Sequence, residues 1–170
     1  GEVSRIDPRT GNISLRIGTG PESTEAMLAA SEQIKGEELT EGQHVRVYVV
    51  EVRRSTRGPQ VLISGTHPGL VRRLFELEVP EIYDGLVEVK SIAREAGSRT
   101  KIAVWSADEA IDPIGACVGP AGQRVNSIVG ELGGEKIDII KYSEDPAQFI
   151  AAAIAPADVV EVRLAEEGKA

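Results

Sequence analysis

Cysteine and aromatic residues are scarce in this 170-residue chain. Its single cysteine, Cys117, excludes an internal disulfide and any multi-cysteine zinc site. A lone cysteine in an apolar stretch is most often a small core residue, and we expect that role here. A nucleophilic role would need a nearby base, but both histidines, His44 and His67, lie in the other half of the sequence. Aromatic residues make up 4% of the chain, so its cores must be built from Val, Ile, Leu and Ala.

Long apolar runs and catalytic motifs are also absent. No run of about 18 or more apolar residues occurs, so no membrane-spanning helix is expected. No basic-then-apolar leader opens the chain, so no secretory signal is expected, and the start at Gly1 without Met suggests a piece of a longer protein. There is no metal-ligand spacing, no Walker loop and no Ser–His–Asp or Cys–His set. We therefore expect no catalytic residues, no metal and no cofactor.

What the chain has in excess is negative charge. Its net charge is −8, and residues 111–170 hold ten Asp and Glu against five Lys and Arg, whereas residues 1–68 are nearly balanced. Proteins that bind nucleic acid are usually basic, because neutralising phosphates supplies much of their affinity. A nucleic-acid site on this chain must therefore depend on local geometry and not on the overall field, and we expect its binding to be weak.

Residues 1–66 have the pattern of a small β-domain. Turns rich in Gly and Pro separate short alternating runs, which predicts several strands in a barrel or sandwich. These runs are Asn12–Ile17, Gln43–Arg53 and Gln60–Ser64. In the longest run we expect four valines to face inward, with a change of phase after the third that indicates a bulge. They are Val45, Val47, Val49 and Val52. The stretch Ser23–Lys35 fits either a short helix or a strand with a loop.

Residues 67–170 have the pattern of an α+β domain with helices on one face of a three-stranded sheet. A helix is expected after Pro68 and ends at Pro80. The other expected elements are paired strands over Leu86–Arg94 and Thr100–Ser106, a helix capped by Asp112, a helix over Gln123–Leu132, a strand over Lys136–Tyr142, a helix from Asp145-Pro146 to Pro156 and a strand over Asp158–Leu164. The loop Gly119-Pro120-Ala121-Gly122 joins the two central helices.

This Gly-x-x-Gly loop is the strongest functional signal in the sequence. Glycine has no Cβ, so the backbone can approach a phosphate closely, and the loop leads into a helix whose free N–H groups and positive end favour an anion. A bare Gly-x-x-Gly is a common pattern, and a plain helix–turn–helix corner is the alternative explanation. Its setting, between two short helices after a β-hairpin and before another strand, resembles the KH domain, whose loop clamps about four nucleotides of RNA.

The KH resemblance implies a binding site around this loop. Pro120 and Ala121 carry no charge and Pro120 has no N–H, so contact with phosphate should depend on the backbone from Ala121 to Gln123 and on Arg124. Bases would lie in an apolar groove between the first of the two helices and the strand that begins at Lys136. The groove candidates are Ile114, Gly115, Val118, Val125, Ile137 and Ile139, and the other candidates on this domain are Gly119, Gly122, Lys136, Arg99 and Lys101.

Longer strings resemble the NusA family of transcription elongation factors. They are Glu78–Ile82, Gly97–Val104, Ile111–Gly119, Glu131–Ile139 and Asp145–Phe149. The resemblance implies an OB-fold β-barrel of the ribosomal-protein-S-one kind over residues 1–66, followed by the first of two KH domains, of type II, over residues 67–170. On the barrel, Tyr48 and Arg46 are the candidates for RNA contact; the alternative is that Tyr48 fills the core or an edge and the arginine lies on a solvated face.

This resemblance also implies the kind of function. We expect non-catalytic binding of single-stranded RNA by a bacterial, cytoplasmic transcription factor that contributes to pausing, termination and antitermination. The implied partners are nascent RNA, RNA polymerase through the full-length protein and other transcription factors, with no membrane and a monomeric state. The family's N-terminal polymerase-docking domain and its second KH domain are not found in this sequence.

Two other functions remain open. Phosphorolytic exonucleases also carry KH and S-one-type domains, but in them the KH domain comes first and a catalytic core precedes both. A protein-docking module is the other possibility, in which the acidic last third binds a basic partner and the Gly-x-x-Gly loop is vestigial. Binding to RNA that weakens with salt would separate RNA recognition from docking.

Overall fold

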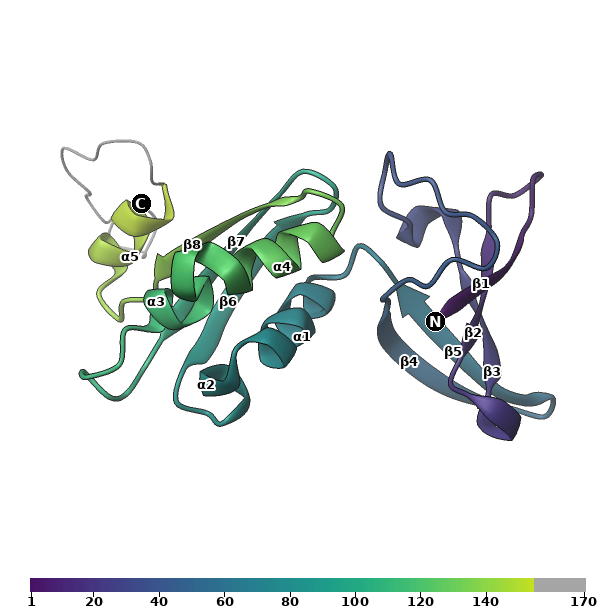
Figure 1. The fold of residues 1–170 in the computed structure, drawn as a ribbon, viewed down its shortest axis with the longest axis horizontal. Helices are drawn as coiled ribbons and strands as arrows, with labels where there is room; N and C mark the ends of the chain where they lie inside the picture. The colour runs from purple at the N-terminus through teal and green to yellow at the C-terminus, as the bar shows by residue number, and fades with distance from the viewer. Residues whose placement is uncertain (155–170) are drawn as a thin grey trace, which may run out of the picture.

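The structure is a computed structural model that describes residues 1–154, and it contains a β-domain followed by an α+β domain (Figure 1). In the first domain five strands form one sheet in the order β1-β2-β3-β5-β4, and only the β3–β5 pair is parallel. The strands are β1 (Glu2–Ile6), β2 (Ile13–Ile17), β3 (Thr24–Leu28), β4 (Tyr48–Ser55) and β5 (Gly58–Ser64), with short 3₁₀ turns at Gly20–Glu22 and Ala30–Glu32.

The sheet closes on itself through the segment that leads into β4. The N–H of Val3 donates to the Gln43 carbonyl at 2.9 Å, and the N–H of Val45 donates to the Gly1 carbonyl at 2.8 Å. These bonds pair the free edge of β1 with the segment that leads into β4, at the other end of the strand order. The sheet is thereby closed into an OB-fold barrel, and the edge of β1 is no longer exposed. Apolar residues from four strands fill the interior: Val3, Ile13, Leu15, Ala26, Leu28 and Ile63.

The structure shows which form Ser23–Lys35 takes and where the bulge in β4 lies. Ser23–Lys35 is a strand followed by a turn, because Ala26 and Leu28 are buried while Met27 between them is 53% exposed. The register of β4 shifts between Val49 and Glu51, which confirms the expected bulge.

However, the prediction that Val49 and Val52 face inward is wrong, because they are 43% and 57% exposed. Most of β4 and the first residues of β5 are exposed, so this part of the β4–β5 hairpin extends beyond the barrel core and leaves Val49 and Val52 exposed.

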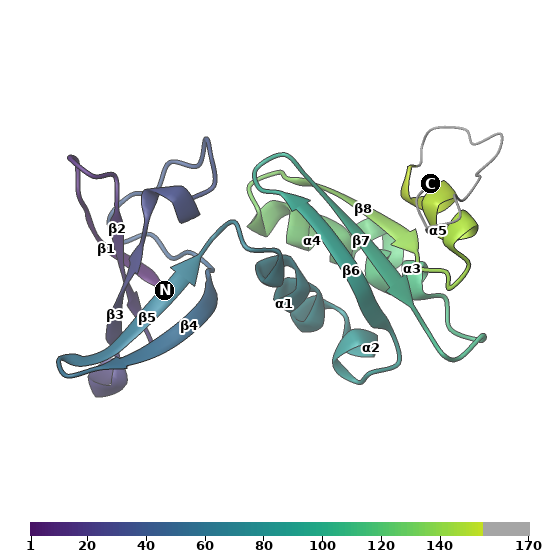
Figure 2. The same ribbon diagram turned by 180° about the vertical axis from the view of Figure 1, so that it is seen from behind.

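Apart from one additional short helix, α2, the described elements of the α+β domain follow the predicted order (Figure 2). Strands β6, β7 and β8 form a sheet in that order, antiparallel between β6 and β7 and parallel between β7 and β8. The elements are α1 (Pro68–Glu78), α2 (Pro80–Tyr83), β6 (Glu88–Glu95), β7 (Arg99–Trp105), α3 (Pro113–Val118), a 3₁₀ turn (Pro120–Gly122), α4 (Gln123–Glu131), β8 (Lys136–Lys141) and α5 (Pro146–Ala153). The expected strand Asp158–Leu164 and the helix end at Pro156 lie outside the described residues.

The core of this domain lies between the sheet and helices α1, α3 and α4. Phe75 of α1, Ile102 of β7 and Ile128 of α4 are fully buried in it. The sequence does not predict the short helix α2, because Pro80 indicates only the end of the preceding helix. In the structure Val79 caps α1, and Pro80 occupies the first turn of α2, where its missing N–H costs nothing. Within residues 1–154, no helix has the length and apolar character needed to cross a bilayer.

Cys117 lies in this core with no exposed surface, which confirms that it is a core residue. The pKa of its thiol is raised to about 12, mainly because the thiol is buried and secondly because the carboxylate of Glu81 lies nearby. We expect the thiol of the native protein to react with a disulfide reagent at pH 8 at least a hundred-fold more slowly than in concentrated guanidinium chloride, as stopped-flow absorbance would show. Equal reaction rates in the native and the unfolded protein would contradict the buried placement.

The raised pKa of Cys117 also affects stability at high pH. The native protein keeps a proton that the unfolded chain releases, so this thiol lowers the free energy of unfolding as the pH rises from about 9 to 12.

Candidate nucleic-acid interface

The Gly119–Gly122 loop has an unusual backbone. Gly119, Ala121 and Gly122 have φ angles of 74°, 53° and 74°, all in the region that L-residues rarely adopt. Ala121 is the one non-glycine residue with positive φ among residues 1–154. A left-handed conformation costs a residue with a Cβ about 1–2 kcal/mol, so the surrounding helices must hold the loop in this shape. Such local strain is found most often at binding and catalytic sites.

Arg124 stabilises the loop from inside. A Cβ at Gly119 would lie 2.6 Å from Cγ of Arg124, so only glycine leaves room for this side chain. The Arg124 Nη1 atom donates at 2.8 Å to Glu81 of α2 and at 2.8 Å to the Ala116 carbonyl. The side chain expected to meet a phosphate is therefore already paired with a carboxylate, which reduces the positive charge that it offers.

The backbone of the loop is partly used as well. The N–H groups of Gly122 and Gln123 donate to the carbonyls of Gly119 and Pro120 within the turn. The first-turn amides of α4 after Gln123, beginning with Arg124, have no upstream helical carbonyl to bond. An anion at this loop would therefore be held by the start of α4 more than by the amide of Gln123.

The expected groove residues come from three elements of the α+β domain, α3, α4 and β8. Ile114 on α3, Val125 on α4, and Ile137 and Ile139 on β8 are half-buried and pack against the domain core. Val118, at the end of α3, is half-buried as well. Gly115 is exposed, but a Cβ there would lie 2.5 Å from the Asp112 carboxylate. Asp112 is the N-cap residue of α3, yet its side chain makes no capping bond, and its charge lies beside the expected path of a base.

The cations predicted to assist on β7 are on the other face of the sheet. Thr100 and Ile102 are buried under the helices, so Arg99 and Lys101 point away from them by the alternation of a strand. Arg99 Nε donates to Asp138 at 2.5 Å, and Lys101 Nζ donates to the Ala153 carbonyl of α5. Lys136 is exposed and lies opposite Arg99 in the β7–β8 register. The structure does not bring these three cations together with Ile137, Ile139 and the loop.

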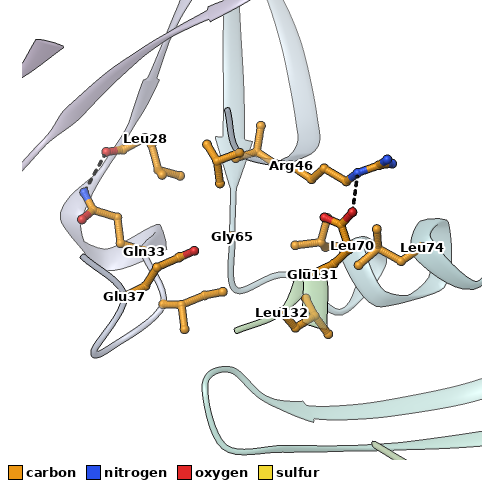
Figure 3. A pocket seen from close by; sticks show the side chains of 12 residues that line it. Leu28, Gln33, Glu37, Arg46, Gly65, Leu70, Leu74, Glu131 and Leu132 are labelled. Carbon is orange, nitrogen blue, oxygen red and sulfur yellow. Dashed lines mark hydrogen bonds and ion pairs between the residues drawn. The ribbon is translucent and has the colours of Figure 1, made fainter. Parts of the chain in front are cut away.

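The two barrel candidates lie at the domain junction. The Tyr48 ring stacks on His67 with centroids 4.6 Å apart and planes at 12°, and it packs against the core of the α+β domain. Arg46 Nε lies 3.4 Å from Oε1 of Glu131, at the end of α4 (Figure 3). Tyr48 thus joins the two domains, and no other tyrosine or tryptophan occurs in residues 1–66 to provide a stacking surface on the barrel.

Apolar side chains of both domains meet at one part of the junction. Leu70, Leu74 and Leu132 of the α+β domain meet Val45 and Val47 of the barrel around a cavity of about 20 Å³ (Figure 3). That volume holds about one water molecule. The two domains are therefore in direct contact through these side chains.

A buried ion pair beside this contact was not predicted from the sequence. Arg94 and Glu135 have fully buried side chains, and Arg94 Nε donates to Glu135 at 3.1 Å. Arg94 Nη1 also donates at 2.9 Å to the carbonyl of His67 in the junction. The string Gly133-Gly134-Glu135 has the composition of an exposed loop, and nothing local to it indicates burial. Among residues 1–154, no three His, Cys, Asp or Glu side chains gather as a metal site.

Comparison with known proteins gives consistent results for both domains. Residues 65–142 match the family described as the NusA-like first KH domain. Over nearly its whole length the chain is similar to proteins named transcription termination/antitermination protein NusA: 55% identical over 98% of the chain in Halalkalibacterium halodurans, 50% over 100% in Bacillus subtilis and 47% over 99% in Thermus thermophilus. It covers 43%, 44% and 42% of those proteins, so it spans less than half of their length.

Proposed function

The chain belongs to the NusA family, and from this premise we propose that it binds single-stranded RNA at the Gly119–Gly122 loop and acts by binding, not by catalysis. The observation that carries the proposal is the left-handed backbone of that loop, set between α3 and α4 in a domain that matches a NusA-like KH family. The same loop in KH domains clamps the RNA backbone.

The physical argument combines the loop with the apolar residues next to it. Positive φ angles at Gly119 and Gly122 expose the backbone, so a phosphate can come within hydrogen-bonding distance of the start of α4. Unstacked bases would then contact Ile114, Val118 and Ile139, which are half-buried and so retain some open apolar surface. Duplex RNA cannot present its bases in this way, which favours single strands.

In the full-length protein this RNA would be the nascent transcript. We propose that the chain contributes to pausing, termination and antitermination by holding RNA as it leaves RNA polymerase, in the bacterial cytoplasm and as a monomer. The relatives are named for termination and antitermination. Contact with the polymerase and with other transcription factors would involve parts of the full-length protein beyond this chain.

Protein docking is the second candidate, and the net charge of −8 favours it. An acidic chain repels RNA at long range, so any affinity must come from short-range contacts. An RNA-processing role has less support, because the barrel precedes the KH domain here and the relatives are named as transcription factors.

Salt dependence separates these candidates. We expect a labelled, A-rich single strand of about a dozen nucleotides to bind with an affinity that falls as salt rises. For about four clamped nucleotides, the slope of log K against log salt should be about −3, since each phosphate contributes about −0.7. Fluorescence anisotropy would measure it, with a duplex of the same sequence as the control. No binding at low salt would refute RNA recognition and leave docking.

A further inference from the structure

An open hollow of about 310 Å³ lies at the domain junction, away from the Gly119–Gly122 loop. It is lined from the barrel, from α1 and from strand β6, which is at the opposite edge of the sheet from β8. The lining residues are Tyr48, His67, Pro68, Gly69, Arg72, Arg73, Glu76 and Ile92. None of the loop residues contributes to it.

The aromatic part of this junction hollow is held in place. His67 is exposed, but one face of its ring stacks on Tyr48, and its Nδ1 accepts the N–H of Gly69 at 2.9 Å. An accepting Nδ1 places the proton of the neutral ring on Nε2. The buried side chain of Arg94 also holds the backbone of His67, because its Nη1 donates a hydrogen bond to the His67 carbonyl at 2.9 Å. The ring is therefore pre-organised, so a further planar group can stack on it at little entropic cost.

The charge of the hollow is positive. Arg73 pairs with Glu76 at 2.8 Å, so these two charges offset each other. Arg72 Nη1 donates to the Val89 carbonyl at 3.2 Å, and within residues 1–154 Arg72 forms no ion pair. One arginine charge thus remains uncompensated next to an exposed, fixed aromatic ring. A planar base carrying a phosphate matches both features.

We propose that the junction hollow binds one nucleotide of single-stranded RNA, with its base stacked on His67 and its phosphate at Arg72, whose charge no carboxylate of residues 1–154 offsets. This inference rests on the proposed function, because it assumes that the chain binds RNA. It assigns Tyr48 the role of supporting His67 and not of receiving a base itself. Since the domains pack against each other, the hollow and the loop would act as two linked sites, and occupancy of one would raise the effective concentration of RNA at the other.

The two histidines allow a direct test. His44 lines a different cleft at the interface, with Arg46 and Glu131, and serves as an internal reference. We would titrate the whole chain with a single-stranded oligoadenylate of about four nucleotides and follow the ring protons of both histidines by NMR. The expected result is a saturable shift of the His67 signals with little change at His44. An Arg72→Gln/Arg73→Gln variant should lose that shift, whereas Arg9→Gln, which removes an arginine from the exposed β1–β2 turn, should keep it.

The Ala121→Asp variant separates this site from the loop. If the hollow is an independent site, His67 still shifts in that variant, and the salt slope in the Arg72→Gln/Arg73→Gln variant falls by about 0.7 for each lost phosphate contact. A His67 shift that disappears in the Ala121→Asp variant would overturn the inference, as would RNA binding at the loop with no His67 shift in the unmodified chain. An absence of binding by any variant would overturn both this inference and the proposed function.

Discussion

Replacing Glu135 by alanine is expected to lower the free energy of unfolding by about 3–5 kcal/mol. Glu135 is 1% exposed and accepts bonds from three residues of the β6–β7 hairpin. Arg94 donates to it from Nε and Nη2, Gly97 from its N–H at 2.7 Å and Thr100 from Oγ1 at 2.7 Å. Without the carboxylate, a guanidinium, an amide and a hydroxyl lose their acceptor in a site that water does not reach. The cost comes mainly from the unpaired Arg94 charge.

Urea unfolding would measure the loss, with two control variants. Glu131→Ala removes an exposed ion pair with Arg46 and should cost less than about 1 kcal/mol. Glu135→Gln keeps the shape but removes the charge, and it should cost nearly as much as Glu135→Ala if the unpaired arginine dominates. A small loss with glutamine and a large loss with alanine would show that packing, not charge, explains the effect. Equal losses at Glu131 and Glu135 would contradict the buried network.

Replacing Ala121 by aspartate is expected to weaken RNA binding about ten-fold or more without unfolding the domain. Ala121 is exposed and has a φ of 53°, a conformation in which Asp and Asn are better tolerated than Ala. Next to a phosphate, a carboxylate adds a repulsion of about 1–4 kcal/mol, and about 1.4 kcal/mol corresponds to a ten-fold change. Substitutions at Gly119 are less informative, because a Cβ there would clash with Arg124 and disturb the fold itself.

The α+β domain was predictable because its signals are local. Pro68 and Pro113 begin helices, Gly133 and Gly134 follow one, and the alternation over residues 136–141 marks β8. Each signal acts within a few residues and agrees with the tertiary fold. The position of the Gly-x-x-Gly loop between α3 and α4 followed from the same reasoning.

The contacts that define the site were not predictable in the same way. Arg124 and Glu81 are 43 residues apart, and Arg94 and Glu135 are 41 apart, so no local pattern indicates that they pair. The exposure of Val49 and Val52 depends on how far the β4–β5 hairpin extends past the barrel, which alternation alone does not reveal. Likewise, the sequence leaves open whether Tyr48 contacts RNA or fills the core or an edge, and only the packing of the two domains places it against His67.

The most direct test of the central claim is the affinity of three Ala121 variants for the same labelled single-stranded RNA, at one low salt concentration. Circular dichroism would first establish that each variant is folded. The account predicts weaker binding with aspartate, nearly unchanged binding with the isosteric but uncharged asparagine, and tighter binding with lysine. Equal affinities for all three would contradict it, because a charge placed in the Gly119–Gly122 loop could then not be close to the bound phosphate.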